Sequence, residues 1–147
     1  MKARFVTKAA LSALALAFAG TLPGVAQQTA APAVDSVKAS AVEKVFIVKM
    51  ADIVQAGLKA GALDVKAVSG VLNEAVKADV SDRVMGAMVS MAAGAFPSSA
   101  PAVASAAVRS YGSNIREGHV RNVIASAVSS QSNPYASVAP ISEAVEK

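Results

Sequence analysis

Three apolar stretches of similar sequence recur along this chain at a spacing of 39 residues. They are VFIVKMA at residues 45–51, VMGAMVS at residues 84–90 and VIASAVS at residues 123–129. Within each stretch the apolar side chains recur at steps of three and four residues, which places them on one face of an α-helix. Repeats of this length are typical of helical-hairpin arrays. The spacing therefore predicts that one helical unit occurs three times.

A second helix is predicted in each unit. The stretches NEAV at 73–76, SAAV at 105–108 and SEAV at 142–145 align, and Pro97 and Pro134 occupy matching turns. The large aromatic and Gly-Tyr positions of the tetratricopeptide consensus are absent, so the pattern predicts an architecture and no family. The alternative is that helices rich in Ala, Val and Ser align by composition alone.

Helix boundaries follow from capping residues and breakers. Ser40 and Glu43 form a capping box, and Gly57 and Gly61 are expected to end the first helix. The inward stripe of that helix is predicted to be Val42, Val45, Phe46, Met50, Ile53 and Val54. The second helix follows the cap Asp64, and the third begins at Asp79 or Ser81 and breaks at residues 94–97.

Three more helices complete the predicted domain. The fourth runs from Ser98 or Ser99 to Gly112, and the fifth opens with the cap-like pair Asn114 and Glu117. The last follows the polar turn 129–134, with Pro140 in its first turn or at a kink and with Val138, Ile141 and Val145 inward. No run alternates with period two. The predicted class is all-α, with about six short amphipathic helices as three degenerate hairpins, in either a short open array or a compact bundle.

The N-terminus has the pattern of a secretory signal peptide. Lys2, Arg4 and Lys8 precede an uncharged run at residues 9–20, and Gly24 and Ala26 suit cleavage before Gln27. The run is too short to span a bilayer. We expect a signal peptide at 1–26, a flexible mature N-terminus at 27–39 and an α-helical domain at 40–147. The protein would leave the cytoplasm by the general secretory route and reside in the periplasm or outside the cell.

Charge and composition limit the partners. Cleavage would leave 121 residues with 11 basic and 10 acidic side chains, a net charge of +1 that gives little attraction for nucleic acid. The uncharged stretch at 84–108 is interrupted by Gly94, Pro97 and Pro101, so no stable membrane span is predicted in the mature chain. The alternative is that this stretch inserts into a membrane as a helical hairpin. The absence of Cys excludes disulfides and thiolate chemistry.

The common catalytic and phosphate-binding motifs are absent from the sequence. His119 is the only histidine and lies two residues from Glu117, a spacing that directs the two side chains to different sides of a helix. Asp79 and Asp82 are three apart, but at a helix start they are expected to cap. We therefore predict no catalytic residues, no metal site and no cofactor.

One cluster suits recognition of a ligand or partner. It brackets the turn between the fourth and fifth helices and comprises Arg109, Tyr111, Arg116, His119 and Arg121. Guanidinium groups and a phenol suit carboxylates, phosphates or glycans. A solvated turn is the competing interpretation. Helical spacing favours a core position for Met85, Met88 and Met91, with an adaptable partner groove as the alternative.

The sequence thus predicts an exported, non-catalytic interaction or structural module. Its partner would be an envelope or secreted protein or a second copy of the chain. The alternative is a small anionic-ligand binder, or an enzyme of unrecognised type, that uses the turn at residues 109–121.

Overall fold

A computed structural model describes residues 39–147, and the predicted signal peptide and residues 27–38 lie outside them. The described part contains six α-helices and two short 3-10 turns, and it contains no strand. The helices are α2 (Ala41–Ala60), α3 (Val65–Lys77), α4 (Asp82–Ala95), α5 (Ala100–Ser110), α6 (Glu117–Ser129) and α7 (Pro134–Glu146). The 3-10 turns are η2 (Pro97–Ser99) and η3 (Gly112–Asn114). The all-α prediction is confirmed.

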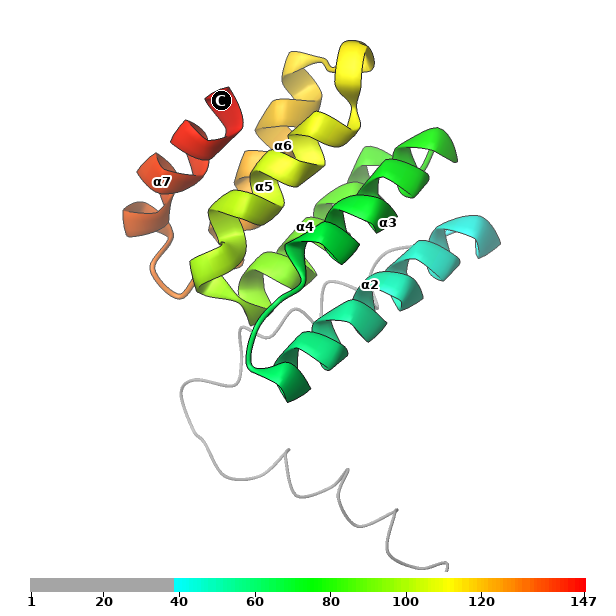
Figure 1. Cartoon of the computed structure of the whole chain (residues 1–147). Helices are drawn as coiled ribbons and strands as arrows, with labels where there is room; N and C mark the ends of the chain where they lie inside the picture. The colour runs from blue at the N-terminus through cyan, green and yellow to red at the C-terminus, as the bar shows by residue number, and fades with distance from the viewer. Residues whose placement is uncertain (1–38) are drawn as a thin grey trace, which may run out of the picture.

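The helices pair as three consecutive hairpins that pack into a compact bundle. Within the hairpins, α2 contacts α3, α4 contacts α5, and α6 contacts α7. Between hairpins, α4 packs against both α2 and α6, and α5 packs against both α3 and α7. Figure 1 shows α2 and α7 at opposite ends of this stack. Among the described residues, the middle hairpin is therefore covered on both sides, and each outer hairpin is covered on one side only.

The core centres on α4 because this helix has neighbours on either side. Val84, Met85, Met88 and Val89 are buried, together with small residues such as Ala92. Burial of side chains of this size stabilises a fold by about 1.5–3 kcal/mol each. Of the three methionines predicted to lie in the core, Met85 and Met88 are wholly buried and Met91 is partly buried. The core interpretation of this methionine group is therefore confirmed.

Small residues allow α4 and α6 to approach closely. A Cβ atom added at Gly86 would lie 2.7 Å from the Ser126 Oγ. The Ser90 hydroxyl donates a hydrogen bond to the Ser126 carbonyl at 2.9 Å, and the Asn122 amide donates to the Asp82 carbonyl at 2.7 Å. The buried Gln131 amide donates to the Ala93 carbonyl at 3.1 Å. The α4–α6 interface is thus close-packed and fixed in register by side-chain hydrogen bonds to the backbone.

Several predicted boundaries hold and others need correction. Ser40 and Glu43 form the predicted capping box, and Asp64 caps α3. Helix α2 does not end at Gly57 but continues to Ala60, and Gly61 ends it with a left-handed φ of 76°. Gly57 lies inside the helix because the Phe96 ring packs against it, 2.9 Å from where a Cβ would stand.

The start of α6 differs from prediction, and of the two places predicted for Pro140 the first turn of α7 is excluded. Helix α6 begins at Glu117 rather than after Asn114, because residues 112–114 form η3 and Ile115 is extended. The Asn114 N–H donates to the Tyr111 carbonyl within that turn. Pro134 occupies the first turn of α7, whereas Pro140 lies inside the helix.

Three valines predicted to face inward are exposed. They are Val42 and Val45 on α2 and Val138 on α7. Both helices lie in the end hairpins, and among residues 39–147 no hairpin packs against the side of each that faces away from the stack. These residues belong to the apolar stripes of their helices, but no described helix covers this part of each stripe.

The Glu43 carboxylate joins α2 to the residue that precedes α4. It accepts hydrogen bonds from the Ser40 N–H at 2.7 Å, the Ser81 N–H at 3.1 Å and the Ser81 hydroxyl. The bond from the Ser81 hydroxyl is the largest cause that lowers the pKa of Glu43 from 4.5 to about 2. Because the folded pKa is the lower one, this stabilisation is complete above pH 4.5 and is lost as the pH falls toward 2.

We therefore expect the free energy of unfolding of the Glu43→Gln variant to fall less than that of the parent when the pH is lowered. The parent protein should lose more of its free energy of unfolding than the variant as the pH is lowered through this window, because the variant has no proton to take up at this position. Urea unfolding followed by circular dichroism at several pH values measures the difference. Identical pH dependence in the two proteins would contradict the assignment.

Candidate functional site

Two residues of the predicted turn cluster meet in the structure. The Tyr111 and His119 rings stack with centroids 4.1 Å apart and planes inclined by 13°. The Tyr111 hydroxyl donates a hydrogen bond to the Asp82 Oδ1 at 3.2 Å, and the His119 Nε2 lies 3.6 Å from the same oxygen. Burial, followed by the negative charge of Asp82, raises the pKa of Tyr111 above its usual range. The phenol therefore keeps its proton and serves as a donor.

His119 also caps α6. Its Nδ1 accepts a hydrogen bond from the Arg116 N–H at 3.2 Å, so the neutral imidazole carries its proton on Nε2, which faces Asp82. Both ring nitrogens are thus engaged within the protein. This arrangement fixes the α5–α6 turn against the start of α4.

The three arginines of the cluster are all exposed. Arg121 forms an ion pair with Glu117 at 2.6 Å on the exposed surface of α6. Arg109 lies in the last turn of α5 and Arg116 immediately before α6, and both are exposed. Exposed ion pairs of this kind contribute about 1 kcal/mol or less. The predicted cluster therefore separates into one packed aromatic pair and three surface arginines.

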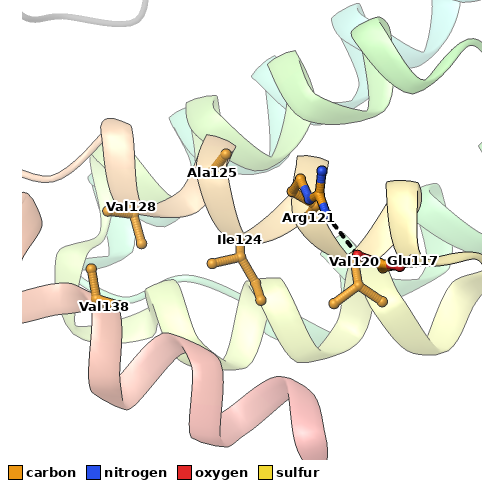
Figure 2. Close-up of a pocket in the computed structure, with 7 residues that line it drawn as sticks. All are labelled: Glu117, Val120, Arg121, Ile124, Ala125, Val128 and Val138. Carbon is orange, nitrogen blue, oxygen red and sulfur yellow. Dashed lines mark hydrogen bonds and ion pairs between the residues drawn. The ribbon is translucent and has the colours of Figure 1, made fainter.

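An apolar groove lies instead between α6 and α7. It has a volume of about 410 Å³ and is open to solvent. Figure 2 shows Val128 of α6 and Val138 of α7 pointing toward one another across it. The lining residues are Glu117, Val120, Arg121, Ile124, Ala125, Val128 and Val138. Of the five predicted site residues, only Arg121 belongs to this groove.

A second apolar surface lies at the other end of the stack, on α2. Val42, Val45 and Val48 follow one another at three-residue steps and are each more than half exposed. The other side of α2 is packed, since Phe46, Ile47 and Met50 are buried. We call Val42, Val45 and Val48 the head face, and the groove between α6 and α7 the tail groove.

Four positions of these surfaces, three in the tail groove and one on the head face, have repeat equivalents that are buried. In the tail groove, Ile124, Ala125 and Val128 are partly or fully exposed. At a spacing of 39 residues these three positions correspond to Met85, Gly86 and Val89 in α4 and to Phe46, Ile47 and Met50 in α2, which are all buried. On the head face Val45 is 53% exposed, whereas its equivalents Val84 and Val123 are 1% and 0% exposed. At these four positions, the two ends of the stack expose residues whose equivalents are covered inside it.

Sequence reasoning missed these surfaces because their residues have the pattern of core residues. It also missed the contact of Asp82 with Tyr111 and His119, since Asp82 carried the signal of a helix cap. The 39-residue offset was the feature that could have pointed to the end surfaces, because it identifies the equivalents of each position in the other units.

Comparison with protein-family models, with curated proteins and with solved structures finds no match to this chain. Within residues 39–147, no helix combines the length and the apolarity needed to cross a membrane.

Proposed function

We propose that this protein is a non-catalytic interaction module that binds an amphipathic helical surface in its tail groove. The observation that carries the proposal is the exposure of Ile124, Ala125 and Val128 at positions that amphipathic helices cover in the first two units. A partner of the same chemistry, with small and branched apolar side chains along one face, would remove this apolar surface from water.

The remaining features support a structural rather than a catalytic role. Five side chains around the predicted turn are already engaged with one another: Asp82 with Tyr111 and His119, and Glu117 with Arg121. The groove lining is mainly apolar, which suits helix docking more than the orientation of a small polar substrate. The second candidate, an anionic ligand held at residues 109–121, is favoured only by the exposure of Arg109 and Arg116.

We further propose that the protein is exported and acts in the periplasm or outside the cell. The support is the basic and apolar N-terminal pattern and the small residues Gly24 and Ala26. The mature protein should begin at or near Gln27. Mass measurement of the protein isolated from its own cells tests this, and a mature pool that retains Met1 would contradict export by cleavage.

Site-specific photo-crosslinking tests the binding proposal. A photoreactive amino acid at Ala125, in the groove, should form protein adducts in living cells, whereas one at Lys66, exposed on α3, should not. Adding Val138→Glu to the protein that carries the crosslinker at Ala125 should remove the adducts, since a charge in the groove opposes apolar docking. Equal adduct yields at the two positions would reject the groove as a binding site.

A further inference from the structure

We propose that the partner in the tail groove is a second copy of the chain, so that copies stack head to tail and continue the hairpin array from one molecule to the next. The head face of α2 in one copy would cover the tail groove of its neighbour. This inference rests on the proposed function, because it names the occupant of the same groove.

The head face includes a repeat position that a groove-equivalent residue already contacts inside the chain. Inside the chain, the side of α6 that faces α4 carries Asn122 and Ser126, which lie next to Gly86. Two repeat lengths earlier in the chain, that is 78 residues, the equivalent positions in α2 are Lys44 and Val48. Val48 is more than half exposed, and nothing in the described residues covers it as α4 covers Ser126.

Side-chain sizes are complementary at the position of closest approach. Between α4 and α6, Gly86 faces Ser126 across a distance too short for an added Cβ. Between α2 and α4 the equivalent pair is Ile47 of α2 and Ala87 of α4. Between two stacked molecules it would be Ala125 in the tail groove of one copy and Val48 on the head face of the next. In each pair at least one member is small, so helices can approach closely and interdigitate. The intermolecular contact would thus follow the pattern of the two internal contacts.

This geometry predicts a heterologous contact. The head face and the tail groove are different surfaces, at opposite ends of the molecule (Figure 1). Each copy therefore has one free surface after it has bound one neighbour. Association of this type does not close in a dimer but extends by addition of further copies.

Two variants, each damaged at one end, test the stacking. The head variant carries Val45→Glu and Val48→Glu, and the tail variant carries Ala125→Glu and Val138→Glu. All four positions are exposed, so both variants should keep the helical circular dichroism of the parent. The protein is purified in the form in which the cell holds it, and its mass is followed by analytical ultracentrifugation from about 1 µM to about 1 mM.

We expect the parent to form species of increasing mass as its concentration rises, and each variant alone to stay monomeric. An equimolar mixture of the two variants should form a dimer, with roughly twice the monomer mass, and nothing larger. The reason is that the mixture retains only the tail groove of the head variant and the head face of the tail variant, which form a single contact.

Three results would overturn the proposal. A parent that is monomeric at every concentration would reject self-stacking. If the head variant alone loses association and the tail variant does not, two head faces bind each other and the groove is not involved. A monomeric parent whose Ala125 crosslinker captures a different protein would reject stacking while the proposed function stands.

Discussion

Replacing Val84 with Asp is expected to unfold the protein, whereas the same replacement at the repeat-equivalent Val45 should leave its stability almost unchanged. Val84 of α4 is buried in the core, and an Asp there would place an unpaired charge among apolar side chains. Such a change costs about 4 kcal/mol or more, a large part of the total stability of a small domain. Val45 is exposed on the head face, where a substitution costs about 0.5 kcal/mol or less.

Urea unfolding of dilute protein, followed by circular dichroism, measures both effects. The Val84→Asp variant should show little helical signal without denaturant, and the Val45→Asp variant should unfold at nearly the midpoint of the parent. An equally large loss at Val45 would show that another part of the same molecule covers the head face, and it would remove the basis for docking there.

Replacing Gly86 with Val should have the second-largest effect, because it forces α4 and α6 apart. A Cβ at this position already meets the Ser126 Oγ at 2.7 Å and the Asn122 amide at 3.2 Å, and Val adds two methyl groups. Overpacking of this kind costs about 1–3 kcal/mol. The hydrogen bonds from Asn122 to the Asp82 carbonyl and from Ser90 to the Ser126 carbonyl should weaken with it.

Ala125 provides the matched control for Gly86. It occupies the same repeat position in the third unit but is exposed in the tail groove, so Ala125→Val should change the free energy of unfolding by about 0.5 kcal/mol or less. Thermal unfolding of the two variants beside the parent gives the comparison. Equal destabilisation would mean that Ala125 is as tightly covered as Gly86.

The sequence is sufficient to predict the helices and their pairing, because apolar periodicity and capping are local signals. Ser40 and Asp64 mark helix starts correctly, since each cap acts on backbone amides within its own first turn. Asn114 fails as a cap signal because the backbone around it forms η3. The exposure of Val45 also cannot be predicted from the apolar stripe of α2. Apolar periodicity marks one face of a helix, but it does not tell whether another helix packs against that face.

The candidate site is predicted less well, because it depends on contacts between distant segments. Tyr111 and His119 are selected together for their chemistry, yet Asp82, which contacts both, lies far from them in the sequence. No sequence spacing signals that contact. The tail groove is missed for a different reason. Ile124 and Val128 have the pattern of core residues, but within residues 39–147 no further hairpin packs over them.

The most direct test of end-to-end recognition is disulfide trapping, which this chain permits because it contains no cysteine of its own. Val48→Cys and Ala125→Cys are prepared as separate variants, mixed and oxidised, with Lys66→Cys in place of either one as the control. A disulfide requires Cβ atoms roughly 3.5–4.5 Å apart, so it forms efficiently only where the two surfaces pack together. We predict that the mixed dimer of the V48C and A125C variants forms faster than any other pairing. If Val48→Cys instead couples mainly with itself, or if no pairing exceeds the Lys66→Cys control, the head face and the tail groove do not recognise each other.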